Sequence, residues 1–121
     1  MYNSRMTYRS HSQDEDGKQR VIVADNVVDF LREIFAEQVV QFDVHDSVTM
    51  TVDDLGKGRF KCTIHTPVKG TVDGERQESI YELLEDFDYI FHKGFYDVED
   101  EGGDETSSWY VATHRPGAPF M

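Results

Sequence analysis

The side chains in this sequence that could do chemistry are mainly carboxylates. Among 121 residues there are 24 Asp and Glu against 12 Lys and Arg, so the formal net charge is −12. The densest group is DVEDEGGDE, from Asp97 to Glu105, in which nine residues include six carboxylates and no cation. Carboxylates bind calcium, act as acids or bases in catalysis, or contact a basic partner. Their spacing helps to decide among these three uses.

The acidic stretch fits only the first half of a calcium-binding loop. Asp97, Glu99, Glu101 and Gly102 match positions 1, 3, 5 and 6 of an EF-hand loop, but Ser108 stands at position 12, which requires a bidentate Glu. The flanking segments also have the alternation of strands instead of the periodicity of helices. We therefore expect no EF-hand, no other metal site and no cofactor, and we leave open weak calcium binding by the stretch.

The histidines give little support for catalysis. None of His45, His65, His92 and His114 belongs to a metal-binding helical pair such as H-E-x-x-H. His92 stands near the end of an expected helix, where a cation is stabilising. We therefore expect no enzyme and no catalytic residue. A small enzyme that uses His65 and His114 with Asp53 is the weakest of three hypotheses.

The one cysteine is expected in the core. Cys62 alternates with Phe60 and Ile64 in the segment RFKCTIH, so these three side chains share one face of a strand. A thiol buried among apolar side chains is unreactive. A single cysteine also excludes an intrachain disulfide, which favours a reducing compartment. Since the sequence begins without an apolar signal segment, we expect a cytoplasmic protein.

Hydrophobic periodicity predicts two helices and several strands. Apolar side chains recur at helical spacing in residues 25–43 and 74–94, and Asp25 or Asn26 is the expected N-cap of the first helix. Lys93 and Gly94 are typical of the end of the second helix. Alternation or short apolar runs predict strands at 20–24, 47–54, 59–65 and 107–114, with an optional edge strand at 95–99.

The order of these elements predicts an α+β fold in which two helices cover one face of an antiparallel sheet. The preferred arrangement is ferredoxin-like, β-α-β-β-α-β with an optional extra edge strand, and the alternative is two helix-plus-hairpin units. Residues 1–19 contain few apolar side chains and are expected to be a flexible tail. A single domain should span 20–114, and the two prolines of residues 115–121 predict an extended arm.

The second expected helix carries negative charge on one side. That side contains Tyr89 and five carboxylates, which are Glu75, Glu78, Glu82, Glu85 and Asp86. Many of them have a like-charged neighbour three or four positions away, which costs about 0.2 to 0.5 kcal/mol per pair in an isolated helix. A solvated surface is the simplest interpretation. A basic partner would compensate for the repulsion and is the more specific one.

The net charge argues against two classes of partner. Nucleic acids and anionic membranes are bound by clustered Lys and Arg, so we expect neither as a direct partner. The leading hypothesis is an acidic protein that covers a basic, nucleic-acid-binding surface of a partner protein. Such a protein would be an inhibitor, an immunity-type protein or a viral counter-defence factor, and would act as a nucleic-acid mimic. The alternative is a chaperone-like or assembly homodimer whose charge provides solubility.

The expected partner-binding residues come from two segments of the chain. They are the acidic side of the second helix and the acidic stretch after it. The full set is Glu75, Glu78, Glu82, Glu85, Asp86, Tyr89, Asp97, Glu99, Asp100, Glu101, Asp104 and Glu105.

Overall fold

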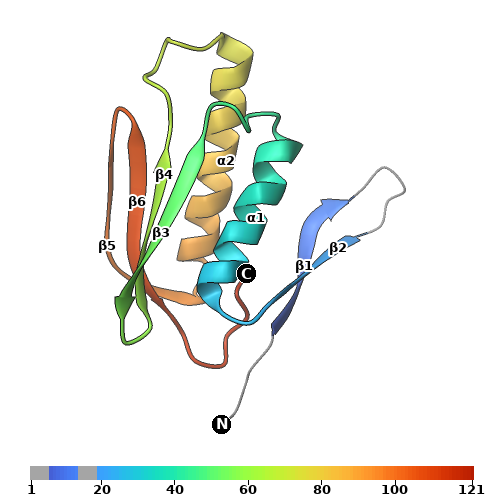
Figure 1. The fold of residues 1–121 in the computed structure, drawn as a ribbon, viewed down its shortest axis with the longest axis vertical. Helices are drawn as coiled ribbons and strands as arrows, with labels where there is room; N and C mark the ends of the chain where they lie inside the picture. Colours follow the sequence, from blue (N-terminus) through green and yellow to red (C-terminus); the bar gives the residue numbers. More distant parts are fainter. Residues whose placement is uncertain (1–5, 14–18) are drawn as a thin grey trace.

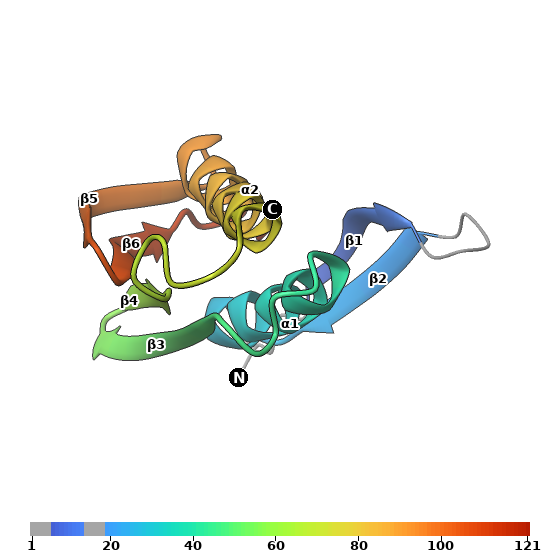
Figure 2. The same cartoon turned by 90° about the horizontal axis from the view of Figure 1, so that it is seen from above.

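The computed structural model of the protein describes residues 6–13 and 19–121. Its main body has two helices and a four-stranded antiparallel sheet, and a two-stranded hairpin lies beside it (Figure 1). Both helices lie on the same side of the sheet, as the view from above shows (Figure 2). The predicted α+β class is therefore confirmed.

The main body consists of two consecutive helix-plus-hairpin units. Its elements are α1 (Val27–Gln41), β3 (Thr49–Gly56), β4 (Arg59–His65), α2 (Gly74–His92), β5 (Tyr96–Asp104) and β6 (Ser107–His114). The strand order is β3-β4-β6-β5, so the second strand of each hairpin is central and the first is at an edge. This connectivity is the alternative arrangement and differs from the ferredoxin-like order.

The difference arises from the N-terminal strands. The ferredoxin-like order requires residues 20–24 in the main sheet, but β2 (Gln19–Ala24) pairs instead with β1 (Met6–Gln13). Residues 6–13 are thus a strand where the sequence predicts a flexible tail. The ladder between the two strands consists of backbone hydrogen bonds, which do not require an apolar pattern in β1. The other residues of the expected tail, 1–5 and 14–18, lie outside the described part of the chain.

Both helices begin at the expected kind of capping residue. The side chain of Asn26 accepts a hydrogen bond from the backbone N–H of Asp29 at 2.9 Å. Asp73 accepts one from the N–H of Arg76 at 2.8 Å. These caps satisfy N–H groups that have no partner within the first helical turn. After α2, Gly94 has a φ of +105°, a backbone conformation that glycine adopts without strain.

The core lies between the helices and the sheet. On β4 the side chains of Phe60, Cys62 and Ile64 are at most 1% exposed, which confirms the predicted alternation and the burial of Cys62. They meet buried side chains of both helices, namely Leu31, Ile34, Ile80, Leu83 and Phe87. Burial raises the pKa of the Cys62 thiol to about 12. A thiol with that pKa stays protonated at neutral pH.

The C-terminal residues 115–121 have no regular secondary structure, yet they contact the core. Phe120 is only 5% exposed, and its ring centroid lies 5.2 Å from that of Phe30 in α1. The Tyr96 hydroxyl donates a hydrogen bond to the backbone oxygen of Phe120. The segment therefore packs against the main body instead of extending away from it. No helix among the described residues is long and apolar enough to cross a membrane.

Candidate partner-binding surface

The acidic side of α2 is exposed along its length. Its six predicted members, Glu75, Glu78, Glu82, Glu85, Asp86 and Tyr89, all face solvent. The opposite side of the helix buries Ile80, Leu83 and Phe87 against the sheet. Packing of that apolar side fixes the rotation of the helix and so directs the carboxylates outward. The helical periodicity of the sequence therefore predicted the exposed side of α2 correctly.

These glutamates are not neutralised by cations of the described residues. Glu75, Glu78, Glu82 and Glu85 form no ion pair with any Lys, Arg or His in that part of the chain. Arg76, the only Lys or Arg within α2, instead forms an ion pair with Asp46 in the loop after α1. The acidic side of α2 therefore keeps its charge for contact with solvent or with a partner.

Asp86 differs from the four glutamates. The Gln38 side-chain amide on α1 donates a hydrogen bond to its carboxylate at 3.5 Å. Asp86 thus stands at the boundary between the two helices, although its side chain is exposed. Its substitution would disturb the contact between the helices, so it is a poor position at which to test partner binding alone.

The acidic stretch after α2 is a strand, where the sequence predicts a loop with an optional short strand. Residues 96–104 form edge strand β5, and Glu105 and Thr106 make a tight turn into β6. A side chain at Gly102 would force the Trp109 ring on β6 to move, because its Cβ would lie 2.5 Å from that ring. The glycine lets this ring pack across the strand. The extended backbone is also incompatible with an EF-hand loop.

Most carboxylates of β5 already have partners within the fold. Three are paired with side chains of other segments: Asp97 with Arg115, Glu99 with Arg59 and Glu101 with His92. A fourth, Asp104, accepts hydrogen bonds in the turn from the Thr106 N–H at 2.9 Å and the Ser107 hydroxyl at 3.0 Å. These bonds, chiefly the one from Thr106, lower the pKa of Asp104. Asp100 and Glu105 are exposed.

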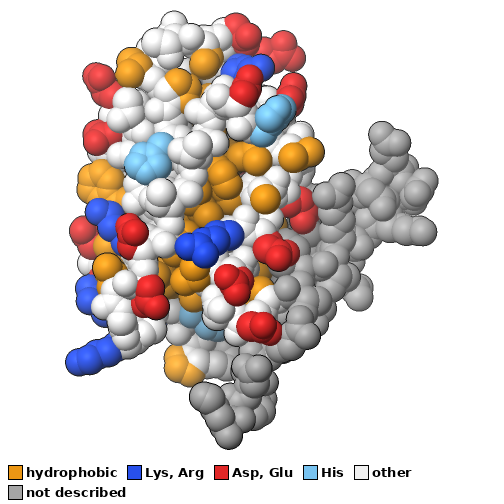
Figure 3. Space-filling view, viewed as in Figure 1, with side chains coloured by type: hydrophobic (Ala, Val, Ile, Leu, Met, Phe, Trp, Pro, Cys, Tyr) orange, Lys and Arg blue, Asp and Glu red, His pale blue; other side chains and the backbone are white. Residues whose placement is uncertain are grey.

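The two predicted acidic segments therefore have different roles in the structure. Most carboxylates of β5 are bonded to other groups of the fold, whereas Glu75, Glu78, Glu82 and Glu85 of α2 form no ion pair among the described residues. The candidate surface is thus centred on α2, and β5 contributes its border. On the face of the molecule drawn in Figure 3, acidic, basic and apolar side chains are intermixed.

An open groove of about 580 Å³ adjoins the C-terminal half of α2. Its lining has an apolar part, Tyr81, Leu84, Tyr89 and Tyr110, and a charged part, Glu85, Asp88, His92 and Lys93. The Tyr110 hydroxyl donates a hydrogen bond to Asp88 at 2.9 Å. Burial, and next the contact with Asp88, raises the pKa of Tyr110. The groove provides aromatic contact area directly beside the acidic side of α2.

Sequence reasoning assigned only Glu85 and Tyr89 of this groove to a binding site. Asp88 and His92 are four residues apart on α2, and this spacing is a signal that places two polar side chains on the same face of a helix. No sequence spacing could indicate that Tyr110 lines this groove, because Tyr110 belongs to β6 and the groove lies beside α2. His92 was expected to interact with the end of its helix, and it contacts Glu101 of β5 as well.

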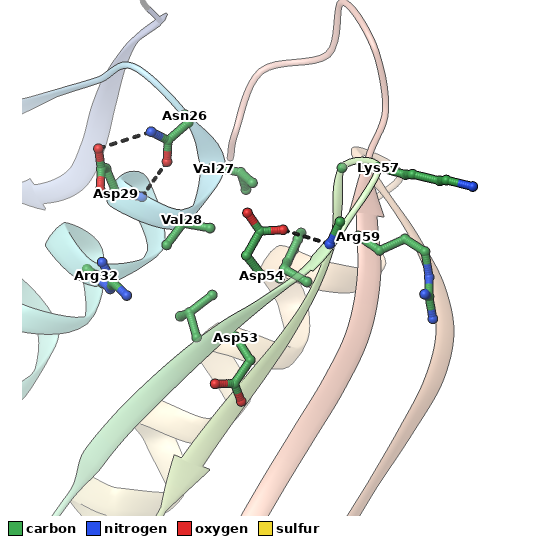
Figure 4. Close-up of a pocket in the computed structure, with 13 residues that line it drawn as sticks. Asn26, Val27, Val28, Asp29, Arg32, Asp53, Asp54, Lys57 and Arg59 are labelled. Carbon is green, nitrogen blue, oxygen red and sulfur yellow. Dashed lines mark hydrogen bonds between the residues drawn. The ribbon is translucent and has the colours of Figure 1, made fainter.

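A second cavity, of about 730 Å³, lies between the start of α1 and the β3–β4 hairpin (Figure 4). Both acidic and basic side chains line it, and those of Lys57 and Arg59 point away from its centre. Arg59 pairs with Glu99, and Asp54 accepts a hydrogen bond from the Gly56 N–H within the hairpin turn. No group of like-charged side chains therefore converges on a ligand position in this cavity.

The three residues of the suggested His/Asp enzyme are not brought together. In the β4–β6 ladder His65 lies opposite Ser107, whereas His114 is at the other end of β6. His65 contacts Thr51 at 3.5 Å, and His114 bonds the backbone oxygen of Pro119 at 3.0 Å. Alternation alone could not reveal this separation, because it does not define the register between strands.

One group of side chains has the donors and the proximity to hold a metal ion. Among the described residues, Asp88, His92 and Glu101 place one donor atom each within 4.8 Å of the others. The group lies where the groove beside α2 meets β5.

No family model matches the chain, and neither a curated protein nor a solved structure is significantly similar to it. A functional conclusion therefore depends on the charge distribution and geometry of the chain itself.

Proposed function

We propose that this protein binds a basic partner protein through the acidic side of α2 and thereby covers a nucleic-acid-binding surface of that partner. It would act in the cytoplasm as an inhibitor, an immunity-type protein or a counter-defence factor, without catalysis. The observation that carries the proposal is the row of exposed glutamates, Glu75, Glu78, Glu82 and Glu85, which have no cationic partner in the described part of the chain.

The spacing of these glutamates suits a surface that normally binds phosphates. Side chains three or four residues apart on a helix lie about 6 Å from one another. That spacing is comparable to the distance between phosphates along a nucleic-acid strand. A rigid helix would therefore present a row of negative charges to the Lys and Arg side chains of a basic groove.

Repulsion between neighbouring glutamates lowers the stability of α2. The pairs Glu75–Glu78, Glu78–Glu82 and Glu82–Glu85 each have like charges at helical contact distance. Each pair destabilises an isolated helix by about 0.2 to 0.5 kcal/mol. A basic partner would reverse the sign of this contribution, because each glutamate would then face a cation.

Aromatic side chains beside the glutamates provide the apolar part of such an interface. Tyr89 is 62% exposed and Tyr81 is 42% exposed on the same helix. Tyrosines are enriched among the residues that dominate binding energy, since they bury a large area and retain a hydroxyl group. Charge alone would give fast association, and these rings would add affinity that persists in salt.

The test uses a triple variant of α2 and a control variant of equal charge. Glu78→Gln, Glu82→Gln and Glu85→Gln remove three charges from the acidic side and leave the Asp86 contact with Gln38 intact. Glu33→Gln, Asp43→Asn and Asp53→Asn remove three exposed charges elsewhere. Immobilised wild-type protein and both variants are exposed to proteins that were eluted from DNA-cellulose, and retained proteins are identified.

A partner should be retained at low salt by the wild-type and control proteins and lost from the α2 variant. The purified partner should bind the α2 variant more weakly by at least about 2 kcal/mol, with a flatter dependence on salt. Wild-type protein should also compete with DNA for the partner. Equal binding of the α2 and control variants, or binding without competition, would contradict the proposal.

The homodimer hypothesis predicts a different result for the wild-type protein and the two variants. A dimer held by apolar contacts should persist at high salt, and its size should not change in the α2 variant. Light scattering of the three proteins at two salt concentrations measures this directly. A salt-resistant dimer without any DNA-competing partner would favour the homodimer.

A further inference from the structure

The last turns of α2 and the middle of β5 are joined through one imidazole. The Nε2 atom of His92 lies 2.9 Å from a carboxylate oxygen of Glu101 and 3.7 Å from one of Asp88. Asp88 and His92 belong to successive turns of the same helix, while Glu101 comes from the strand. Two carboxylates from different elements therefore face the same ring nitrogen.

The fold holds these side chains from both sides. In the β5–β6 ladder Glu101 lies opposite Tyr110, and hence on the side of the sheet that α2 covers. The Tyr110 hydroxyl donates a hydrogen bond to the same Asp88 oxygen that lies near His92. A hydrogen bond of this kind orients a carboxylate that binds a metal, and it leaves the second oxygen of Asp88 free to act as well.

We propose that Asp88, His92 and Glu101 form a binding site for one divalent transition-metal ion. The imidazole nitrogen favours zinc, cobalt or nickel over calcium and magnesium, which prefer sites made of oxygen atoms only. The two carboxylates balance the charge of the ion. This site is independent of the partner-binding proposal, because the exposed glutamates that carry that proposal are not among its ligands.

The distances fit such an ion after small side-chain rotations. The three donor atoms lie within 4.8 Å of one another, and ligands of one zinc ion at bond lengths of about 2.0 to 2.2 Å lie somewhat closer together. His92, Asp88 and Glu101 have side chains that are 41%, 56% and 46% exposed, so they can rotate. The adjoining groove leaves room for water or an exogenous ligand in an open coordination position.

A metal ion bound to Nε2 of His92 would take the place of the hydrogen bond between that nitrogen and Glu101. The imidazole must be neutral to bind the ion, so affinity should fall as the solution becomes acidic. The bound ion would cross-link α2 to edge strand β5 and should raise the melting temperature, since it binds only the folded chain at this site.

The experiment uses untagged full-length protein after treatment with a chelator. Zinc chloride is titrated in a calorimeter, and cobalt chloride is titrated in a spectrometer, where a cobalt–imidazole complex gives visible absorption. We expect one high-affinity equivalent of zinc. His92→Ala and Glu101→Gln should each weaken zinc binding at least tenfold, while His65→Ala and Glu105→Gln, which remove the same kinds of group elsewhere, should leave it unchanged.

Circular dichroism of each variant shows whether it is folded. If the His92→Ala protein does not fold, the Glu101→Gln protein decides the result. Zinc affinity that is equal in the Glu101→Gln and Glu105→Gln proteins would overturn the proposal. The proposal would also be overturned if zinc and magnesium bound equally and moderate salt abolished the binding of both. Such a result would indicate only a general attraction of cations to an acidic surface. Absence of any zinc binding would overturn the proposal as well.

Discussion

The Tyr96 hydroxyl donates a hydrogen bond of 2.6 Å to the backbone oxygen of Phe120. This bond joins the first residue of β5 to the end of the chain, 24 residues later. His114, at the end of β6, lies between the two, with ring centroids 5.3 Å from Tyr96 and 4.8 Å from Phe120. The C-terminal segment therefore closes one end of the core.

Phe120→Ala should lower the free energy of unfolding by about 3 kcal/mol, because it leaves a cavity beside Phe30 and removes a buried ring. Pro119→Ala is the control, since Pro119 is exposed and only its backbone oxygen makes a described hydrogen bond. Urea denaturation followed by circular dichroism measures both. Equal stability of the two variants would mean that the C-terminal segment does not contribute to the core in solution.

Cys62 should not react with a thiol reagent in the folded protein at pH 8. Its side chain is fully buried, and burial raises the pKa of the thiol to about 12. The neutral thiol is a poor nucleophile. Labelling should become fast only in denaturant, and the rate measured by absorbance should follow unfolding. Fast labelling of the folded protein would place Cys62 outside the core.

A chain that begins at Gln19 should fold into the same main body. Among the described residues β1 pairs only with β2, and neither strand belongs to the four-stranded sheet. A two-stranded hairpin is marginally stable by itself, so its loss should have little effect on the core. Thermal denaturation of the shortened and full-length chains tests this. A large loss of stability would show that β1 supports the main body.

Asp104 should contribute to stability at neutral pH and lose that contribution in acid. Its folded-state pKa is lowered, chiefly by the hydrogen bond from the Thr106 N–H, so the ionised form is favoured in the folded protein. The contribution is present above the unfolded pKa of about 3.9 and disappears as the pH falls through the lower folded pKa.

Asp104→Asn should therefore be less stable than wild type at pH 6, and the difference should shrink as the pH is lowered from 5 to about 2. Urea denaturation at several pH values measures this difference. Glu105→Asn, at an exposed neighbouring position, serves as the control. A difference for Asp104 that stays constant with pH would mean that its charge is not involved.

The local elements could be predicted from the sequence because each depends on residues close together in the chain. The cap of α1 was expected at Asp25 or Asn26 from their residue types, and the structure uses Asn26. The burial of Cys62 and the exposed row of glutamates on α2 follow from periods of two and 3.6 residues. These periods state which side of an element is buried. They therefore also identified the acidic side of α2 before any contact was known.

Only the tertiary structure decided between the ferredoxin-like arrangement and the two helix-plus-hairpin units. Alternation shows which face of a strand is apolar, but it does not show which other strand will pair with that strand through backbone hydrogen bonds. The sequence alone therefore could not decide whether residues 19–24 belong to the main sheet. Tertiary contacts also separate the acidic residues: packing of α2 beside β5 brings His92 to Glu101, and the strand order β4-β6-β5 brings Arg59 to Glu99. The glutamates of α2 form no ion pair because no other element of the described chain brings a cation to them.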